Sequence, residues 1–238
     1  MYKFLLRPKW LAFHLLIAAL VVVMINLAIW QVHRLQGRLD FNDQLRSNRK
    51  VATQPIGEVL ADNVDTKDVE WRSVTAEGEY EVGSDLLFVN VSQFGTAGVD
   101  AISVLVLGDG TKVLVNRGFV PLNDEVPDAP TGKQTVTGYL RRSMEHRAGA
   151  LDNSSTGQLT ELQRIDIPRI DEQVDGDLAP MFIQSSTETN EPPYPVALPE
   201  LTNGPHLSYA IQWCIFSICA LAGWVLVVRR AVRKRAAA

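Results

Sequence analysis

Polar and aromatic side chains gather where two long apolar stretches of the sequence begin or end. Ahead of the second stretch, His206 is followed by Tyr209 and Trp213, which lie within about 60° of it on a helical wheel. Histidine ligates iron, and aromatic rings stack on flat molecules. The stripe therefore suits a planar amphiphile with an apolar body.

The first apolar stretch ends in a second cluster, Trp30-Gln31, followed by Arg34 and, one turn later, Arg38. Guanidinium forks match carboxylates, so these arginines suit the acidic groups of such an amphiphile. The two clusters predict a cofactor site of His206, Tyr209, Trp213, Arg34 and Arg38, and a partner-binding role for Trp30 and Gln31. The alternative is that these are the ordinary aromatic and basic residues of a membrane interface, whose long side chains reach lipid headgroups.

Residues 11–30 and 207–228 contain no charged residue and are each long enough to cross a hydrocarbon core of about 30 Å as a helix. Since the first lacks the short apolar run and small-residue cleavage site of a signal peptide, we expect an uncleaved anchor. His14 and Asn26 lie inside the first span. They are expected to bind a neighbouring helix or, alternatively, to be satisfied within this helix pair or by local water.

Charge divides the chain into three parts. All 27 acidic residues lie between Asp40 and Glu200, where 15 basic residues leave a net charge of −12, whereas the two ends together carry +8. Basic residues flanking spans favour the cytoplasmic side. We therefore predict a cell-membrane protein with two spans, a cytoplasmic N-terminus (1–10), an extracytoplasmic domain (31–206) and a basic cytoplasmic tail (229–238).

The extracytoplasmic domain is predicted to be rich in β-strands. Residues 31–50 are expected to continue the first helix beyond the membrane, and 187–205, with its many prolines, to form an extended tether. Residues 144–164 are polar and are predicted to be a mobile excursion. Asp166 is expected to cap a short helix that reaches about Val174. Gly108-Asp109-Gly110 is predicted to be a hairpin turn. The expected class is an α+β membrane protein whose two transmembrane helices flank an antiparallel barrel or sandwich, with strands at 71–80, 86–94, 101–107, 112–120, 134–142 and 181–186.

The sequence argues against an enzyme. Three of the four histidines flank or lie within the membrane segments, and no hydrolase, zinc, thiol-redox or phosphate-binding motif occurs. An acidic domain argues against nucleic-acid binding, and ten residues at each end are too few for a cytoplasmic effector.

Five motifs occur in order along the chain: Trp30-Gln31 with Arg34 and Arg38; Val74 and Gly78; Val115-Asn116-Arg117-Gly118-Phe119-Val120-Pro121; Gly138 to Arg141; and His206-Leu207 with Tyr209, Ala210 and Trp213. At these residues the chain resembles the Surfeit locus protein 1 family of cytochrome c oxidase assembly factors, over nearly its whole length. Two departures are Phe119, where tryptophan is usual, and Ala28, where a glycine often precedes the Trp-Gln pair.

The resemblance implies a membrane-anchored factor that assists heme a insertion into the oxidase or stabilises its catalytic subunit. Some bacterial members look like heme a binders, which implies transient heme a binding with His206 as the iron ligand. The implied partners are cytochrome c oxidase subunits, within a respiratory supercomplex or outside it, heme a synthase and membrane lipids. Two alternatives stay open: a stably bound accessory subunit without heme chemistry, and a generic extracytoplasmic binding domain unrelated to respiration.

The Val115–Pro121 motif has a structural interpretation and a functional one. As a strand, its residues alternate between two faces, Gly118 permits a close approach or a bulge, and Pro121 ends the ladder. Asn116 or Arg117 would, in the functional interpretation, contact a partner. The two interpretations are equally favoured by the sequence.

Overall fold

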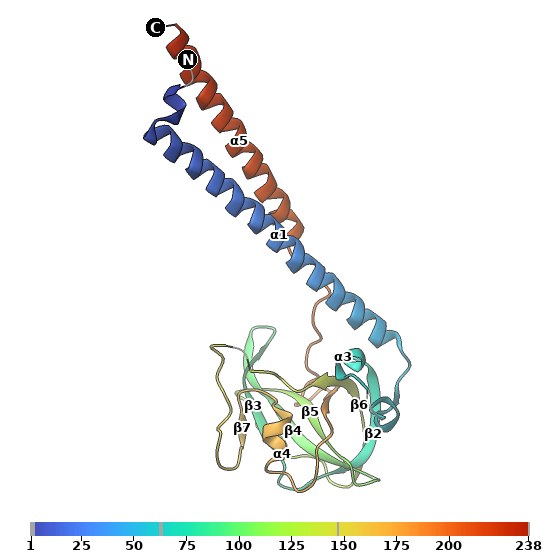
Figure 1. The fold of residues 1–238 in the computed structure, drawn as a ribbon. Coiled ribbons are helices and arrows are strands. Elements are labelled where there is room, and N and C mark those ends of the chain that lie inside the picture. The colour runs from blue at the N-terminus through green and yellow to red at the C-terminus, as the bar shows by residue number, and fades with distance from the viewer. Residues whose placement is uncertain (1–2, 62–63, 147, 238) are drawn as a thin grey trace. The chain divides into compact units, whose positions relative to one another are not determined.

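The computed structural model describes residues 3–61, 64–146 and 148–237 (Figure 1). The chain divides into two compact units. The helical unit comprises Met1–Asp43 with Glu200–Ala238, and the β unit comprises Gln44–Pro199.

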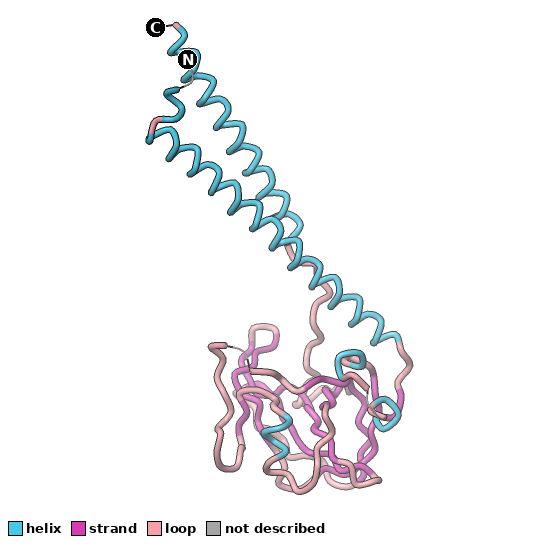
Figure 2. Tube along the Cα trace, in the orientation of Figure 1, coloured by secondary structure: helices cyan, strands magenta, loops and turns pink. Residues whose placement is uncertain are grey.

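The helical unit consists mainly of two long helices, α1 (Pro8–Lys50) and α5 (His206–Ala236), after a short 3-10 turn at Lys3–Leu6. They run side by side in Figures 1 and 2. Both are long and apolar enough to cross a membrane, and only 17% and 6% of the residues in their most apolar windows are buried. A core helix of a soluble fold would be mostly buried, and these two helices are not. Apolar surfaces of this extent on a protein mark contact with a membrane or a partner.

Helix α1 is one uninterrupted helix, as predicted for residues 31–50, and Gly37 does not break it. Its 43 residues extend about 64 Å, roughly twice the thickness of a hydrocarbon core. Met24, Ala28 and Gln31 form a buried seam at spacings of four and three, which is the pattern of one helix packed along another.

The β unit is built on a ring of five strands. The sheet order is β1-β2-β6-β8-β5-β4-β3-β7, and an additional β2–β4 pairing closes β2, β6, β8, β5 and β4 on themselves. The strands are β1 (Gln54–Pro55), β2 (Ser73–Tyr80), β3 (Leu86–Gln93), β4 (Thr96–Leu107), β5 (Lys112–Pro121), β6 (Lys133–Arg142), β7 (Glu161–Leu162) and β8 (Met181–Ser185).

The expected α+β class with a β-rich domain is confirmed, with a difference in strand direction. Most neighbours are antiparallel, but β1–β2, β3–β7 and β5–β8 are parallel, which makes the sheet mixed. The predicted turn is present between β4 and β5, where Gly110 has φ +87° and its N–H bonds to Leu107 O at 2.9 Å.

Alternation along the strands produces two large buried clusters, and Val99, Ala101 and Val120 form a smaller third one. Val74, Leu105 and Ile183 are among the side chains inside the ring. The other face of the same strands carries Ile102 and Phe182, which pack beneath the short helix α4 (Ile167–Asp171). Each central strand is therefore apolar on both faces, and a polar side chain on the outer face stands out.

The prediction of a mobile polar excursion at 144–164 is wrong for its second half. Leu159 and Leu162 are buried in the outer core, together with Ile165 just beyond it, and β7 pairs with β3. Leu159 and Leu162 are isolated among polar residues, so only their contacts with the sheet and α4 reveal their burial. Asp166 accepts a hydrogen bond from Arg169 N and caps α4, as predicted, but the helix ends at Asp171.

Two short helices complete the β unit, α2 (Ile56–Val59) and α3 (Thr66–Val69). Asp65 caps α3 by accepting a hydrogen bond from Lys67 N at 2.9 Å.

Candidate functional site

The most specific polar contact between the two long helices joins His206 to Gln31. His206 Nδ1 lies 2.8 Å from Gln31 Oε1, and the Gln31 side chain is 9% exposed. An amide oxygen accepts only, so Nδ1 carries the proton and the lone pair of the neutral ring is on Nε2. A histidine held by its other ring nitrogen is the usual arrangement of a metal-ligating imidazole.

Gly204 keeps the edge of the His206 ring clear. Its φ is +65°, and a Cβ on it would lie 3.3 Å from both Nε2 and Cδ2 of His206. Among the described residues, Nε2 has no hydrogen-bond partner. Gly204, two residues before α5, therefore places no side chain against Nε2.

The aromatic residues predicted for this end of the helices do not all lie on the same side of α5. Helix α5 packs through Ala210 and Ser217, which are 6% exposed, whereas Tyr209 is 47% and Trp30 53% exposed. Trp213 is partly exposed and meets Phe216 edge to face with ring centroids 5.9 Å apart. Tyr209 and Trp30 are thus exposed near the Gln31–His206 pair, whereas Trp213 lies one turn from Ala210 and Ser217, on the packed side of α5.

The two predicted arginines have different surroundings. Arg38 Nε and Nη2 donate to Thr202 O at 3.1 and 3.0 Å, and Nη2 also lies 3.3 Å from Glu200 O. Arg38 therefore holds the segment that leads into α5. Arg34 is exposed on α1, so its guanidinium is the more accessible of the two for an acidic group.

The polar residues inside the first span each bond within the helix pair, in line with the second of the two sequence-based expectations. Trp224 Nε1 donates to His14 Nδ1 at 2.8 Å, and Asn26 Nδ2 donates to Val22 O of its own helix at 2.8 Å. Each residue thus has a hydrogen-bond partner within the helix pair.

The structure places Asn116 in the interior of the β unit. Asn116 is 3% exposed, donates through Nδ2 to Asp100 Oδ2 at 2.8 Å, and accepts from Gly118 N at 3.0 Å. The register skips one residue here, since Ile102 pairs with Asn116 and Ala101 with Gly118. The bulge expected for Gly118 is therefore present, with Arg117 as its extra residue.

Arg117 also points into the protein, and its side chain is 7% exposed. Its Nη2 donates to Pro127 O at 2.8 Å and lies 3.4 Å from Asp85 Oδ1, while Nη1 donates to Asp128 O at 3.0 Å. Burial raises the pKa of the nearby Tyr80 to about 12, and the charge of Arg117 opposes that rise. The contacts of Arg117 are those of a structural residue that fixes the loop after β5.

The close approach expected at Gly118 is made by residues 193–197, called the strap below. Phe119 N donates to Tyr194 O at 2.7 Å and Tyr194 N donates to Phe119 O at 2.8 Å. A Cβ on Gly118, whose φ is +138°, would lie 2.3 Å from Tyr194 O. Part of the predicted extended tether is thus bonded to β5.

Gln93 at the end of β3 fastens the strap a second time. Its Nε2 donates to Pro195 O at 3.1 Å, and its Oε1 accepts from Ala197 N at 2.9 Å, as a neighbouring strand would. Sequence reasoning did not single out Gln93 or Tyr194, because no local motif links residues about a hundred positions apart.

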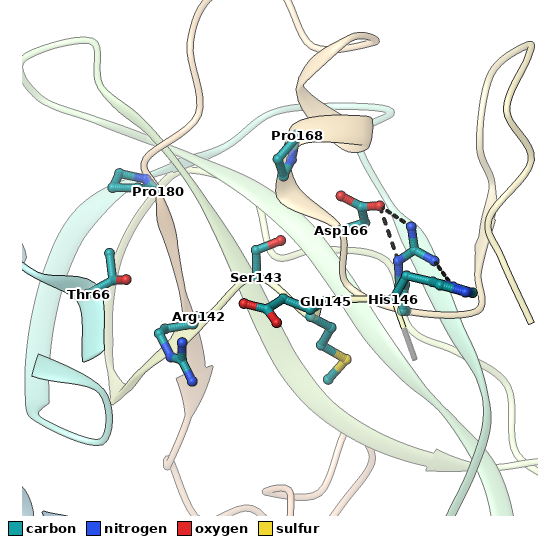
Figure 3. Close-up of a pocket in the computed structure, with 10 residues that line it drawn as sticks. Thr66, Arg142, Ser143, Glu145, His146, Asp166, Pro168 and Pro180 are labelled. Carbon is teal, nitrogen blue, oxygen red and sulfur yellow. Dashed lines mark hydrogen bonds and ion pairs between the residues drawn. The ribbon is translucent and has the colours of Figure 1, made fainter. Parts of the chain in front are cut away.

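A polar cavity of about 390 Å³ lies between β6 and α4 (Figure 3). His146 contacts Asp152 at 2.9 Å and Arg164 at 3.3 Å, while Ser143 Oγ accepts from Ile167 N at 3.0 Å. No Ser–His hydrogen bond and no metal-holding cluster occurs among the described residues. The cavity therefore lacks a nucleophile–base pair.

Comparison with known proteins gives matches along most of the chain. The sequence profile of the SURF1 family matches residues 18–218. An uncharacterized SURF1-like protein of Mycobacterium tuberculosis is 29% identical over 227 residues, covering 92% of this chain and 83% of that protein. A SURF1-like protein of Monosiga brevicollis is 26% identical (88% and 85% covered), and Surfeit locus protein 1 of Gallus gallus is 23% identical (92% and 75% covered).

Proposed function

Since the chain belongs to the SURF1 family, we propose that it is a membrane-anchored, non-enzymatic assembly factor of a heme-copper cytochrome c oxidase. It assists the insertion of heme a or stabilises the catalytic subunit while heme a is placed. Both termini are cytoplasmic and the β unit is extracytoplasmic in this proposal. Oxidase subunits, heme a synthase and membrane lipids are the partners.

The observation that carries the heme part is the Gln31–His206 contact. Gln31 fixes the imidazole so that the lone pair of Nε2 is available, and Gly204 leaves its edge clear. The exposed ring of Tyr209 offers a flat apolar surface, and Arg34 offers a guanidinium for a propionate. When bound, heme a supplies an iron that accepts an imidazole nitrogen. Transient binding fits a site in which the Tyr209 ring is exposed.

The heme proposal is tested by co-expressing the full chain with the enzymes of heme a synthesis and measuring heme a in the purified protein by absorption spectroscopy. His206→Ala is expected to abolish heme a binding. Gln31→Leu, which removes the acceptor but keeps the ligand, is expected to lower it. His33→Ala is the matched control, because His33 is an exposed histidine at the same end of the span. Equal heme content in wild type and His206→Ala would remove the ligand role.

The assembly role is tested separately in the source organism. Deletion of the gene should lower the heme a spectrum and the oxidase activity of membranes, and the wild-type gene should restore both. Normal heme a and oxidase activity after deletion would contradict the proposed role. An assembly factor is expected in substoichiometric amounts in purified oxidase, whereas a one-to-one ratio without heme would support the accessory-subunit alternative.

A further inference from the structure

A row of polar side chains, three buried and one 23% exposed, crosses four adjacent strands on the outer face of the ring. Its members are Arg141 on β6, Gln184 on β8, Asn116 on β5 and Asp100 on β4, and the last three are 3–4% exposed. The surrounding face is apolar, so a polar row here has a cost in desolvation. Two of the four residues come from the motifs that the helical site does not use.

The row lines a cavity of about 210 Å³. The cavity walls are apolar and aromatic, with Phe88, Phe119 and Phe182 from three strands, and Val196 of the strap also lines it. Gln184 Nε2 donates to Val196 O at 3.3 Å, which ties the strap to the polar row. The cavity is therefore a mostly apolar chamber with a few polar groups, the usual composition of a small-molecule site.

Arg141 is fixed in place and still has donors to offer. Its Cζ lies 3.7 Å from the centroid of the Trp71 ring, Nη1 donates to Gln184 Oε1 at 2.7 Å, and Nε lies 3.5 Å from Glu70 Oε1. These contacts use two of the five guanidinium N–H groups. The remaining N–H groups on Nη1 and Nη2 form the fork that binds a carboxylate in a bidentate manner.

Asp100, the acidic residue that lines the cavity, does not favour a cationic ligand. Burial raises the pKa of Asp100, which opposes ionisation, and the hydrogen bond from Asn116 only partly offsets this. Arg141 is the one cationic residue among the described residues that line the cavity.

We infer that this cavity binds a carboxylate carried on a short aliphatic stem, with the carboxylate on the Arg141 fork and the stem between the phenylalanine rings. A volume of about 210 Å³ lies below the ~300–1,000 Å³ of sites for drug-sized ligands, so the occupant is a small group and not a tetrapyrrole. The carboxylate comes either from a free short-chain acid or from the C-terminus of a polypeptide. This site is separate from the His206 site, and its absence would leave the proposed assembly role unaffected.

The test is calorimetric titration of the full chain in detergent with butyrate, with N-acetyl-leucine as a mimic of a chain terminus, and with butyramide as the uncharged control. Butyrate or N-acetyl-leucine should bind, and butyramide should bind at least about tenfold more weakly, because it forms no charge-assisted fork. Tighter binding of butyrate points to a free acid, and tighter binding of N-acetyl-leucine to a chain terminus. Equal binding of butyramide, or no binding of either acid, overturns the inference.

Three variants locate the binding. Arg141→Gln should weaken it about 10- to 100-fold. Arg142→Gln is the matched control, because Arg142 contacts the same Glu70 at 2.9 Å but does not line the cavity. Asp100→Asn, which keeps a polar side chain of the same shape, should bind the acid as well as wild type or better. It serves as the test if Arg141→Gln fails to fold. Equal loss in both arginine variants, or a tenfold loss in Asp100→Asn, contradicts the proposed orientation.

Discussion

Replacing Gly118 by alanine should loosen the strap from β5. The added Cβ would lie 2.3 Å from Tyr194 O, and this backbone atom can move only if the strap moves. At φ +138° an L-residue is also strained, by about 1–3 kcal/mol. Displacing the strap removes the two Phe119–Tyr194 backbone hydrogen bonds, at about 0.5–1.5 kcal/mol each. The expected loss in the free energy of unfolding is about 2–6 kcal/mol.

Two measurements on the full chain in detergent check this expectation. Denaturant unfolding gives the change in stability, and hydrogen exchange of peptides covering the strap should show faster exchange at Tyr194 and Ala197. Exchange in strands inside the ring should be little changed, because a domain with about 5–15 kcal/mol of stability stays folded after a loss at the low end of this range.

Gly83→Ala is the matched control for left-handed strain without crowding. Gly83 has φ +79°, and nothing lies within 4 Å of a Cβ built on it. Gly83→Ala should lower the free energy of unfolding by only about 1–2 kcal/mol and leave hydrogen exchange in the strap unchanged. If Gly118→Ala costs no more than Gly83→Ala and the strap exchanges as in wild type, Gly118 is not required for docking.

Three further changes have defined outcomes. Trp224→Phe removes the donor to His14 and should weaken the helix pair by about 0.6–1.7 kcal/mol, measured by unfolding in detergent, whereas no change would show that the bond contributes nothing. Asp100→Asn should raise the free energy of unfolding at neutral pH. Because the pKa of Asp100 is raised in the folded state, ionisation of this carboxyl lowers the free energy of unfolding as pH rises above the ordinary aspartate range. Asp100→Asn should lose that part of the pH dependence, and a variant less stable than wild type at neutral pH would contradict this. Gln93→Ala should speed exchange at Ala197 with little global destabilisation, and unchanged exchange would show that the backbone pair with Phe119 holds the strap alone.

Local pattern predicted much of the fold. The length of the uncharged stretches gave the two long helices, and alternating apolar residues gave β2, β3, β5, β6 and β8 within a few residues. Gly110 marked the turn before β5, because a left-handed position favours glycine. These features depend on residues close together in the chain, so a single sequence contains them.

Contacts between distant residues escaped prediction. Leu159 and Leu162 lie in a polar stretch, and only the sheet and α4 around them make them core residues. The strap has the composition of a flexible tether, yet Gln93 and Phe119 hold it. The composition of a segment indicates how flexible it is in isolation. Whether the segment is held in place depends on hydrogen-bond partners that lie on other strands.

The candidate site divides in the same way. The sequence by itself determined that His206, Tyr209 and Trp213 share a helix face and that Arg34 and Arg38 lie one turn apart, since helical periodicity requires it. Only the tertiary structure decided that Gln31 orients His206 from 175 residues away and that Arg38 holds backbone carbonyls. The tertiary structure also decided that Asn116 and Arg117 are buried. A hydrogen bond across helices or strands depends on where two separate segments are packed, and no spacing within one segment specifies that.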